Sequence, residues 1–279
     1  MNAAGLPARQ ATLLQRRLLI AAAFAALAVL VIAPVGVVLV KAFQDGLGAW
    51  TRAVLHPDTR AAFLLTLGIA VVAVPLNAAF GLAAAYLCAR RRFPGRLLLL
   101  LLSELPFSVP PVLTGLFFVL LLGPSSALGA WLGDHGLRFL YTPLALVLTT
   151  LFVTFSFVLR TVLPVLQGGI WDEEEAAQVL GASPSWTFLK VTLPRLSFAL
   201  ANGILLLSAR AIGEFGAVSV VSGRIRGLTN SLPLQVEAFY FDQDETAAFA
   251  AATLLVLLAL GLQAAKWWLQ GRAAEKERA

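Results

Sequence analysis

Long apolar stretches, each almost free of charge, dominate the chain and constrain what it can fold into. The first of them, Leu18 to Val40, runs for 23 residues without a charged side chain. A helix needs about 20 apolar residues to cross the hydrocarbon core of a bilayer. With 59% hydrophobic and only 13% charged residues, the chain has too little charge to solvate a soluble surface. The sequence therefore predicts an all-α polytopic membrane protein.

We predict about six transmembrane helices in one domain, residues 18–269, with short tails at 1–17 and 270–279. The first apolar run is too long for the core of a cleaved signal peptide, so we expect it to span the membrane. Three prolines along the third span remove backbone donors and predict a bent or broken helix. The predicted spans are 18–40, 61–89, 97–122, 141–159, 196–221 and 246–269.

Basic residues are distributed unevenly between the two sides of the predicted membrane. Fourteen of the 21 Lys and Arg residues fall on the side that carries both tails and the loop 172–194. Because basic residues accumulate in cytoplasmic loops, this side is predicted to be cytoplasmic. The net charge of +6 is then explained by topology and contact with anionic lipid, without nucleic-acid binding. The other side carries Lys41, Arg52, Arg60, Arg138, Arg224 and Arg226, and Arg210 lies inside the fifth span.

The loop 172–194, which we call the elbow, is the longest charged, helix-forming interruption of the apolar sequence. Asp172 is a suitable N-cap, and the three glutamates after it fill a first helical turn, where the macrodipole stabilises carboxylates. Gly181 is placed to end this helix. Ser183 and Pro184 predict the start of a second helix, which should end near residues 191–194. The sequence thus predicts two short helices joined by a turn, with small side chains on the first.

The elbow resembles the EAA loop of the permease subunits of bacterial ABC importers. That loop reads Glu-Ala-Ala, three residues, Gly, nine residues, an aliphatic residue, any residue, then Leu-Pro. The resemblance implies a type I ABC importer permease fold, in which a cytoplasmic coupling helix docks on a separate ATPase. From the residues alone, an interfacial helix without a partner is the alternative. The matching positions are Glu175, Ala176, Ala177, Gly181, Val191, Leu193 and Pro194.

The fifth span contains two charged residues, Arg210 and Glu214, which are four positions apart and should share a helix face and pair. A charged side chain at the bilayer centre costs about 2.5–3.5 kcal/mol on insertion scales, so the pair should face the protein interior. Ala209, Gly213 and Ala217 form a ridge of small residues that permits close helix approach. Two hypotheses remain open: Arg210 contributes positive potential to an anion path, or the pair is a structural link between helices or subunits.

Further segments narrow the resemblance to the permeases of sulfate/thiosulfate importers, and among these to the W-type subunit. The segment GEFG is shared with molybdate/tungstate permeases, which are the alternative assignment, whereas SLPLQ favours sulfate. Pro110 departs from the small residue that the family pattern has before Pro111. The segments are RAIGEFGAV at 210–218, the run from Val221 to Gly227, SLPLQ at 231–235 and LPFSV at 105–109.

The resemblance implies a heterodimer with a T/U-type permease subunit, two copies of a cytoplasmic ATPase and a periplasmic sulfate- or thiosulfate-binding protein. The complex would lie in the bacterial inner membrane. This chain would bind no cofactor, because none of its own lysines follows a glycine as a Walker A motif requires. ATP and Mg²⁺ would be used by the partner ATPase. A polar lining for the anion is expected at Thr114, Ser208, Arg210, Glu214 and Ser219, with backbone groups freed at the kinks of span three.

Signatures of catalysis and metal binding are absent from the sequence, which has no G-x-S-x-G, HExxH or G-x-G-x-x-G pattern. His56 and His135 lie apart in polar loops, and Cys88 is the single cysteine, so neither a metal centre nor a disulfide within the chain is predicted. The chain is therefore expected not to be an enzyme on its own. A gradient-driven secondary anion transporter is the alternative from another class, although such proteins typically carry relay residues and repeats near the midplane.

Overall fold

The computed structural model describes residues 6–169 and 171–276, and every regular element among them is a helix. The predicted all-α class is therefore confirmed. In chain order the elements are α1 (Leu6–Leu27), η1 (Ala28–Ile32), α2 (Ala33–Phe43), α3 (Leu47–Leu55), α4 (Pro57–Arg90), α5 (Arg96–Ser108), α6 (Pro111–Leu122), α7 (Ala127–Asp134), α8 (Pro143–Thr154), α9 (Ser156–Gln167), α10 (Trp171–Val179), α11 (Pro184–Thr187), η2 (Phe188–Thr192), α12 (Leu193–Ile212), α13 (Gly216–Val221), α14 (Leu232–Phe241) and α15 (Glu245–Lys276).

Five helical stretches of the described chain are long and apolar enough to cross a membrane, and a sixth is gained if α5 and α6 count as one broken span. The axes of α5 and α6 meet at 112°. Val109 and Pro110 are extended between them, and Pro111 opens α6, so the prolines break this span as predicted. The five stretches are Gln15–Phe43, Pro57–Arg90, Pro143–Gln167, Pro184–Val221 and Glu245–Leu269.

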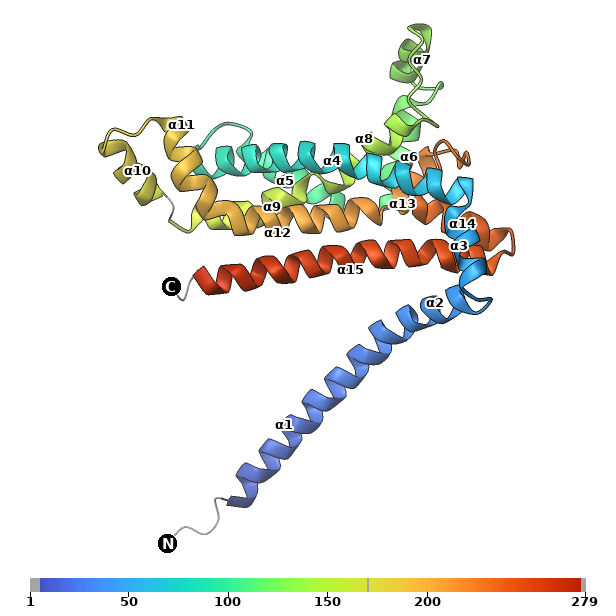
Figure 1. Ribbon diagram of the computed structural model, residues 1–279. Coiled ribbons are helices and arrows are strands. Elements are labelled where there is room, and N and C mark those ends of the chain that lie inside the picture. The colour runs from blue at the N-terminus through green and yellow to red at the C-terminus, as the bar shows by residue number, and fades with distance from the viewer. Residues whose placement is uncertain (1–5, 170, 277–279) are drawn as a thin grey trace.

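Most of the two predicted tails is helical, because α1 already begins at Leu6 and α15 continues to Lys276. The remaining tail residues, 1–5 and 277–279, lie outside the described residues. In Figure 1 the start of α1, the end of α15 and the helix α10 all lie toward the same side of the molecule. The elbow and both ends of the described chain are therefore on one side, and α3, α7 and α14 are on the other.

The core of the bundle is formed by α4, α9 and α12, which run side by side in Figure 1. Its buried residues include Ala84 and Ala85 of α4, Val158 and Leu159 of α9, and Leu207 of α12. Small side chains on α4 let the larger aliphatic side chains of α9 and α12 pack closely, and α15 lies against α12. This packing fixes the end of α9, which precedes the elbow, and the start of α12, which follows it.

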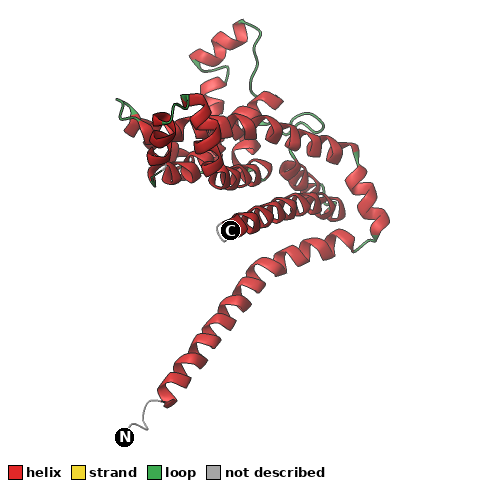
Figure 2. Cartoon of the chain, turned by 60° about the vertical axis from the view of Figure 1, so that its left-hand side comes forward, coloured by secondary structure: helices red, strands yellow, loops and turns green. Residues whose placement is uncertain are grey.

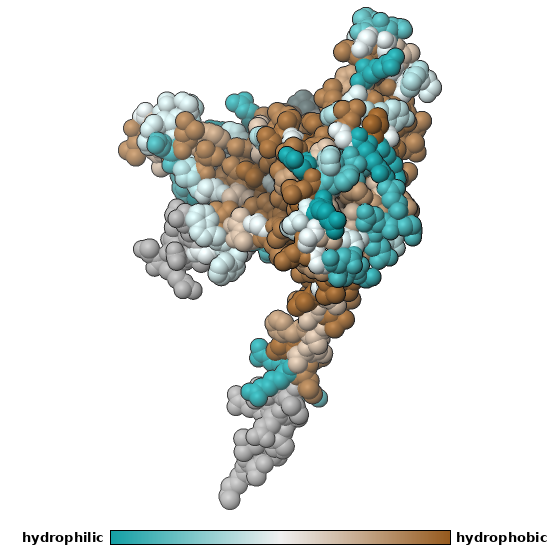
Figure 3. Space-filling model, turned by 45° about the vertical axis from the view of Figure 1, so that its right-hand side comes forward, coloured by the Kyte–Doolittle hydropathy of each residue, from teal (hydrophilic) through white to brown (hydrophobic). Residues whose placement is uncertain are grey.

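The first span touches the bundle in its C-terminal part, where α2 packs against α15. Its apolar window within Gln15–Phe43 is not buried inside the protein at all, and α1 diverges from the other helices in Figures 1 and 2. Figure 3 shows apolar side chains over the flanks of the molecule and hydrophilic ones gathered toward the end that carries the α3 and α14 loops. Such a surface is suited to lipid or to another membrane chain.

We expect Gly115→Ala to destabilise the fold because α6 and α13 touch at this glycine. A Cβ atom at Gly115 would lie 2.5 Å from the carbonyl oxygen of Ala217 and 2.8 Å from the Cβ of Val220. Overpacking of this kind costs about 1–3 kcal/mol. The matched control is Gly68→Ala in α4, where no atom lies within 4 Å of the added carbon. Thermal unfolding of the purified protein in detergent measures the difference, and equal midpoints for the two variants would contradict this close contact.

Candidate functional site

The elbow begins with α10, at the end of the bundle where α9 ends and α12 begins (Figure 1). Asp172 lies inside the first turn of α10 together with Glu173 and Glu174, so the prediction that Asp172 is the N-cap is wrong. The helix already includes Trp171, whose ring packs edge-on against Tyr86 of α4 with centroids 6.1 Å apart. This aromatic contact holds the start of α10 against the end of the second span.

The end of α10 has the backbone geometry that was predicted from Gly181. This residue has φ of +90°, in the left-handed region. The amide of Ala182 donates to the carbonyl of Ala177 at 3.0 Å, and the amide of Gly181 donates to the carbonyl of Gln178 at 2.9 Å. These two bonds form a Schellman motif, which satisfies carbonyls at the helix end. Ser183 caps the next helix, since its Oγ accepts from the amide of Trp186 at 3.4 Å.

The second helix of the elbow does not end near residues 191–194, so this part of the prediction is wrong. Instead, α11 continues through the π-helical turn η2 into α12. Leu193 donates its amide to the carbonyl of Phe188 across the wider turn, and Pro194 follows in the first turn of α12. A proline near a helix start is tolerated, because its missing amide is not needed there. The second half of the elbow and the fifth span are thus one continuous helical stretch from Pro184 to Ile212.

The residues of the EAA pattern lie on an exposed part of the elbow. Glu175, Ala176 and Gly181 are exposed, and Val179 and Leu180 are each 88% exposed at the tip. These two side chains form a small exposed apolar surface at the tip of the elbow. Glu175 has no ion pair within the described chain, whereas Glu173 lies 3.5 Å from Arg195. Of the remaining positions, Ala177, Val191 and Leu193 are half-buried and Pro194 is exposed.

Glu174 was missed by the sequence analysis, which placed it with its neighbours in a solvated first turn. Its side chain is 2% exposed and lies 2.8 Å from Nη1 of Arg90, at the end of α4. It also accepts a hydrogen bond from the hydroxyl of Thr192 in η2. The signal that could have found it is its spacing, because Glu174 follows Trp171 by three residues and so shares the inward face of α10.

The charged residues of span five pair as predicted, although they do not share one continuous helix. Arg210 Nη1 lies 2.5 Å from Oε2 of Glu214, with the side chains 31% and 1% exposed. The helix α12 ends at Ile212, and α13 begins only at Gly216, so the pair bridges a break. The break is stabilised by Glu214, whose Oε1 accepts from the amide of Ala217 at 2.9 Å.

The predicted ridge of Ala209, Gly213 and Ala217 is interrupted by this break, because Gly213 caps the end of α12. Close approach occurs at another glycine: a Cβ atom on Gly216 would lie 3.0 Å from the Cβ of Pro111. Since Pro111 follows the break in span three, the two broken spans lie against each other at their breaks. Pro110 and Gly213 at these breaks are nevertheless exposed in the single chain, and non-helical backbone at membrane depth is tolerated only where protein or a water-filled cavity surrounds it.

The other residues expected to line an anion path lie on the same helices. Thr114 of α6 is buried beside the contact with α13. The hydroxyl of Ser208 donates to the carbonyl of Ile204 at 2.7 Å, and that of Ser219 donates to the carbonyl of Gly216 at 2.8 Å. These serines therefore bond to their own helices in this conformation.

A second charged pair at membrane depth was not expected. The predicted end of span four at residue 159 is too early, since the span continues to Gln167 and includes Arg160. Nη2 of Arg160 lies 2.5 Å from Oε2 of Glu104 in α5, and its guanidinium lies 4.2 Å from the ring centroid of Phe107. The two side chains are 44% and 49% exposed. Charges are unfavourable next to lipid tails, so this face is suited to another chain or to water.

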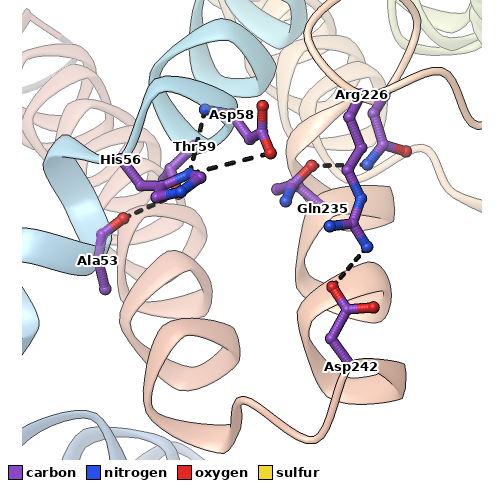
Figure 4. Close-up of polar contacts among 8 residues, drawn as sticks. Ala53, His56, Asp58, Thr59, Arg226, Gln235 and Asp242 are labelled. Carbon is purple, nitrogen blue, oxygen red and sulfur yellow. Dashed lines mark hydrogen bonds and ion pairs between the residues drawn. The ribbon is translucent and has the colours of Figure 1, made fainter.

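The segment 231–235 forms the N-cap and first residues of α14, and all of its residues except Pro233 are buried. Figure 4 shows Gln235 of this helix with Arg226 and Asp242 beside it. Gln235 is fully buried, and its Oε1 accepts from Nδ2 of Asn230 at 2.7 Å. The amide of Leu232 donates to the hydroxyl of Thr66 in α4 at 2.8 Å. Arg226 lies 2.5 Å from Asp242 beside this cluster. The segment SLPLQ, which favoured the assignment to sulfate permeases, therefore packs the loop before α14 onto α4. Its side chains do not form an open binding surface.

The two histidines lie in separate loops. Nδ1 of His56 accepts from the amide of Asp58 at 3.3 Å, while Nδ1 of His135 lies 2.8 Å from the carbonyl of Trp131. Across the residues that the structure describes, no group of three or more His, Cys, Asp or Glu side chains is arranged to hold a metal ion.

Comparison with known proteins matches most of the chain to transport proteins of the inner membrane. The family described as "Binding-protein-dependent transport system inner membrane component" matches residues 77–272. The sulfate transport system permease protein CysW of Escherichia coli strain K12 is 45% identical over 251 residues, covering 90% of this chain and 86% of that protein. CysW of Synechocystis is 43% identical and covers 87% and 88%. CysT of Escherichia coli strain K12 is 37% identical and covers 81% and 84%.

Solved structures agree on the fold. A chain of a bacterial alginate ABC transporter, in complex with a periplasmic protein that holds an alginate pentasaccharide, superposes with a TM-score of 0.74. The two chains are 16% identical, and the match covers 91% of this chain and 92% of that one. The prediction of an ABC importer permease fold is confirmed, and the chain is a multi-pass membrane protein. The chain belongs to the family of inner membrane components of binding-protein-dependent transport systems.

Proposed function

We propose that this chain is the W-type permease subunit of an ATP-driven importer of sulfate or thiosulfate in the bacterial inner membrane. The observation that carries the proposal is the 45% identity to a CysW protein over 90% of the chain. The identity to a CysT protein is lower, at 37% over 81% of the chain, which favours the W-type over the T-type subunit. The names of these relatives favour sulfate over the molybdate/tungstate alternative.

A second permease subunit of the T/U type would complete the path. Two features of the described chain support such a partner. The exposed pair of Arg160 and Glu104 lies within membrane-spanning helices, where contact with lipid is unfavourable. The broken spans also leave non-helical backbone at their breaks, which requires a protein or water-filled surrounding. A second permease subunit would cover the ion pair and the non-helical backbone with protein.

The elbow would dock on a cytoplasmic ATPase, two copies of which would use ATP and Mg²⁺. Support comes from the exposed apolar tip at Val179 and Leu180, the small residues Ala176 and Ala177, and the open surface around Gly181. The excess of Lys and Arg on this side favours a cytoplasmic position for the elbow and both termini. A periplasmic sulfate- or thiosulfate-binding protein would then deliver the anion at the opposite end, from which α7 projects in Figure 1.

The anion would pass near the two helix breaks. Sulfate is a strongly hydrated dianion, so a path through the membrane must replace its water with polar groups. Helix ends and unwound backbone at the midplane provide such groups in other transporters. Here they lie around residues 109–110 and 213–215. We propose that polar and charged side chains close to these breaks in the sequence line the path. They are Thr114, Ser208, Arg210, Glu214 and Ser219.

Reconstitution into proteoliposomes with the partner permease, the ATPase and the binding protein tests the proposal. We expect uptake of radiolabelled sulfate that requires hydrolysable ATP and is inhibited by unlabelled thiosulfate. Uptake that persists without ATP, driven by an ion gradient, would establish the secondary transporter instead. Uptake of molybdate in preference to sulfate would establish the other oxyanion assignment.

A further inference from the structure

Three elements of the described chain meet at the buried carboxylate of Glu174. Arg90 ends the second span, Thr192 lies in the turn that leads into the fifth span, and Glu174 lies in the elbow helix α10. Nη1 of Arg90 lies 2.8 Å from Oε2 of Glu174, and the hydroxyl of Thr192 donates to Oε1. We call these three residues the clasp. The ion pair joins residues that are 84 positions apart in the sequence.

Aromatic rings fix the position of the arginine. The guanidinium of Arg90 lies 5.6 Å from the ring centroid of Tyr86 and 5.7 Å from that of Trp171, and it donates to the Tyr86 hydroxyl. Tyr86 also packs edge-on against Phe188, with centroids 5.5 Å apart. The guanidinium thus contacts two rings as well as the carboxylate, and these contacts restrict how it can turn.

The other charges of the same region are arranged differently. The neighbouring pair of Glu173 and Arg195 is mostly exposed at 3.5 Å, where water weakens the attraction. Arg91 and Arg92 follow Arg90 directly, yet they are exposed and form no ion pair within the described chain. Of these three arginines only Arg90 pairs with Glu174, and its own side chain is 38% exposed. Removing Arg90 would leave the buried carboxylate of Glu174 without its cation.

The arrangement has a mechanical consequence. The helix α10 packs chiefly against α11 and η2, which are continuous with α12. A displacement of the elbow therefore reaches α12 directly through the backbone. It reaches α4 through side chains, namely Glu174 on Arg90 and Trp171 on Tyr86. The clasp is thus the charged part of the direct link between the elbow and the end of α4, which also packs against α12 within the bundle.

We propose that Arg90 is a positioning residue, which acts through Glu174 to hold α10 against the end of the second span, so that a displacement of the elbow is transmitted to that span as well as to the fifth. This inference rests on the proposed function, because it assumes that an ATPase moves the elbow. It assigns a role in transport to a residue outside the EAA pattern. It also explains why only the second of the three glutamates after Asp172 is buried.

The test compares uptake and ATP hydrolysis in the reconstituted complex. We expect Arg90→Gln to retain hydrolysis but to lower the sulfate transported per ATP at least tenfold. The charge swap, Arg90→Glu with Glu174→Arg, should restore at least half of the original ratio. Arg91→Gln is the matched control, since it removes an adjacent exposed arginine, and its ratio should be unchanged.

Two results would overturn the proposal: an unchanged ratio in Arg90→Gln, or a swapped pair that assembles but does not regain coupling. If Arg90→Gln fails to assemble, the double variant Arg90→Gln with Glu174→Gln removes both charges. The double variant is expected to assemble and still transport poorly per ATP, and normal transport by it would overturn the proposal. A failure of the proposed function is distinguishable, because the unaltered complex would then not transport sulfate with ATP at all.

Discussion

Gly181→Arg will uncouple sulfate uptake from ATP hydrolysis while the chain remains inserted in the membrane. Gly181 has φ of +90°, and the left-handed conformation costs other residues roughly 1–2 kcal/mol. The added side chain would also stand on an open surface, because no atom lies within 4 Å of the place that its Cβ would take. It would therefore obstruct a docked ATPase without disturbing the bundle. Uptake of radiolabelled sulfate and phosphate release by proteoliposomes measure the two activities.

Two further variants separate strain from obstruction. Gly181→Ala introduces the strained backbone without the bulk, so we expect a smaller loss of coupling. Gly46→Arg places the same side chain at another glycine with positive φ and an open surrounding, on the opposite side of the molecule. It should leave the ratio of uptake to hydrolysis unchanged.

Glu175→Lys with Ala177→Arg changes the same surface without altering Gly181, and we expect the same uncoupling. Glu175 is exposed and has no ion pair in the described chain, so its replacement should not affect folding. Normal uptake by this variant and by Gly181→Arg would contradict a role of the elbow in coupling.

The second large effect is expected at Arg210. Arg210→Ala would leave the carboxylate of Glu214, which is 1% exposed, without its cation. Removing one partner of a buried pair typically costs about 3–5 kcal/mol. We therefore expect a strong fall in the thermal stability and membrane yield of this variant. An unchanged unfolding midpoint would contradict the pairing.

The double variant Arg210→Met with Glu214→Gln distinguishes the two hypotheses for this pair. Both charges are gone, and the Gln oxygen can still accept from the amide of Ala217, so we expect stability to recover. Normal sulfate uptake by this stable variant would identify the pair as a structural link. Loss of uptake with intact stability would instead identify Arg210 as part of the anion path.

The elements that could be predicted from the sequence depend on local or solvent-imposed rules. The bilayer demands apolar segments of sufficient length, so five long spans followed from hydropathy, and the sixth is the broken pair of α5 and α6. The end of α10 shortly before Gly181 and the N-cap of α11 at Ser183 followed from capping chemistry, which involves only neighbouring residues. The same holds for the broken third span, where proline removes donors regardless of the tertiary structure.

The features that were missed depend on contacts between distant residues. Nothing near Glu174 indicates that Arg90, at the end of another span, will neutralise it. The break after Ile212 has no proline to signal it, and it is stabilised by Glu214 and by the close packing of α6 on α13. Pro194 suggested a helix end, but a π-helical turn carries the helix past it.

The unbroken stretch from Pro184 to Ile212 makes the fifth span a lever. At 1.5 Å per residue it is roughly 40 Å long. A tilt of about 10° at the elbow would then swing its far end sideways by roughly 7 Å. That far end carries Arg210 and adjoins the break bridged by Glu214. In the proposed complex, a small tilt of the elbow by the ATPase would therefore produce a larger displacement at the far end of α12, where Arg210 and Glu214 lie.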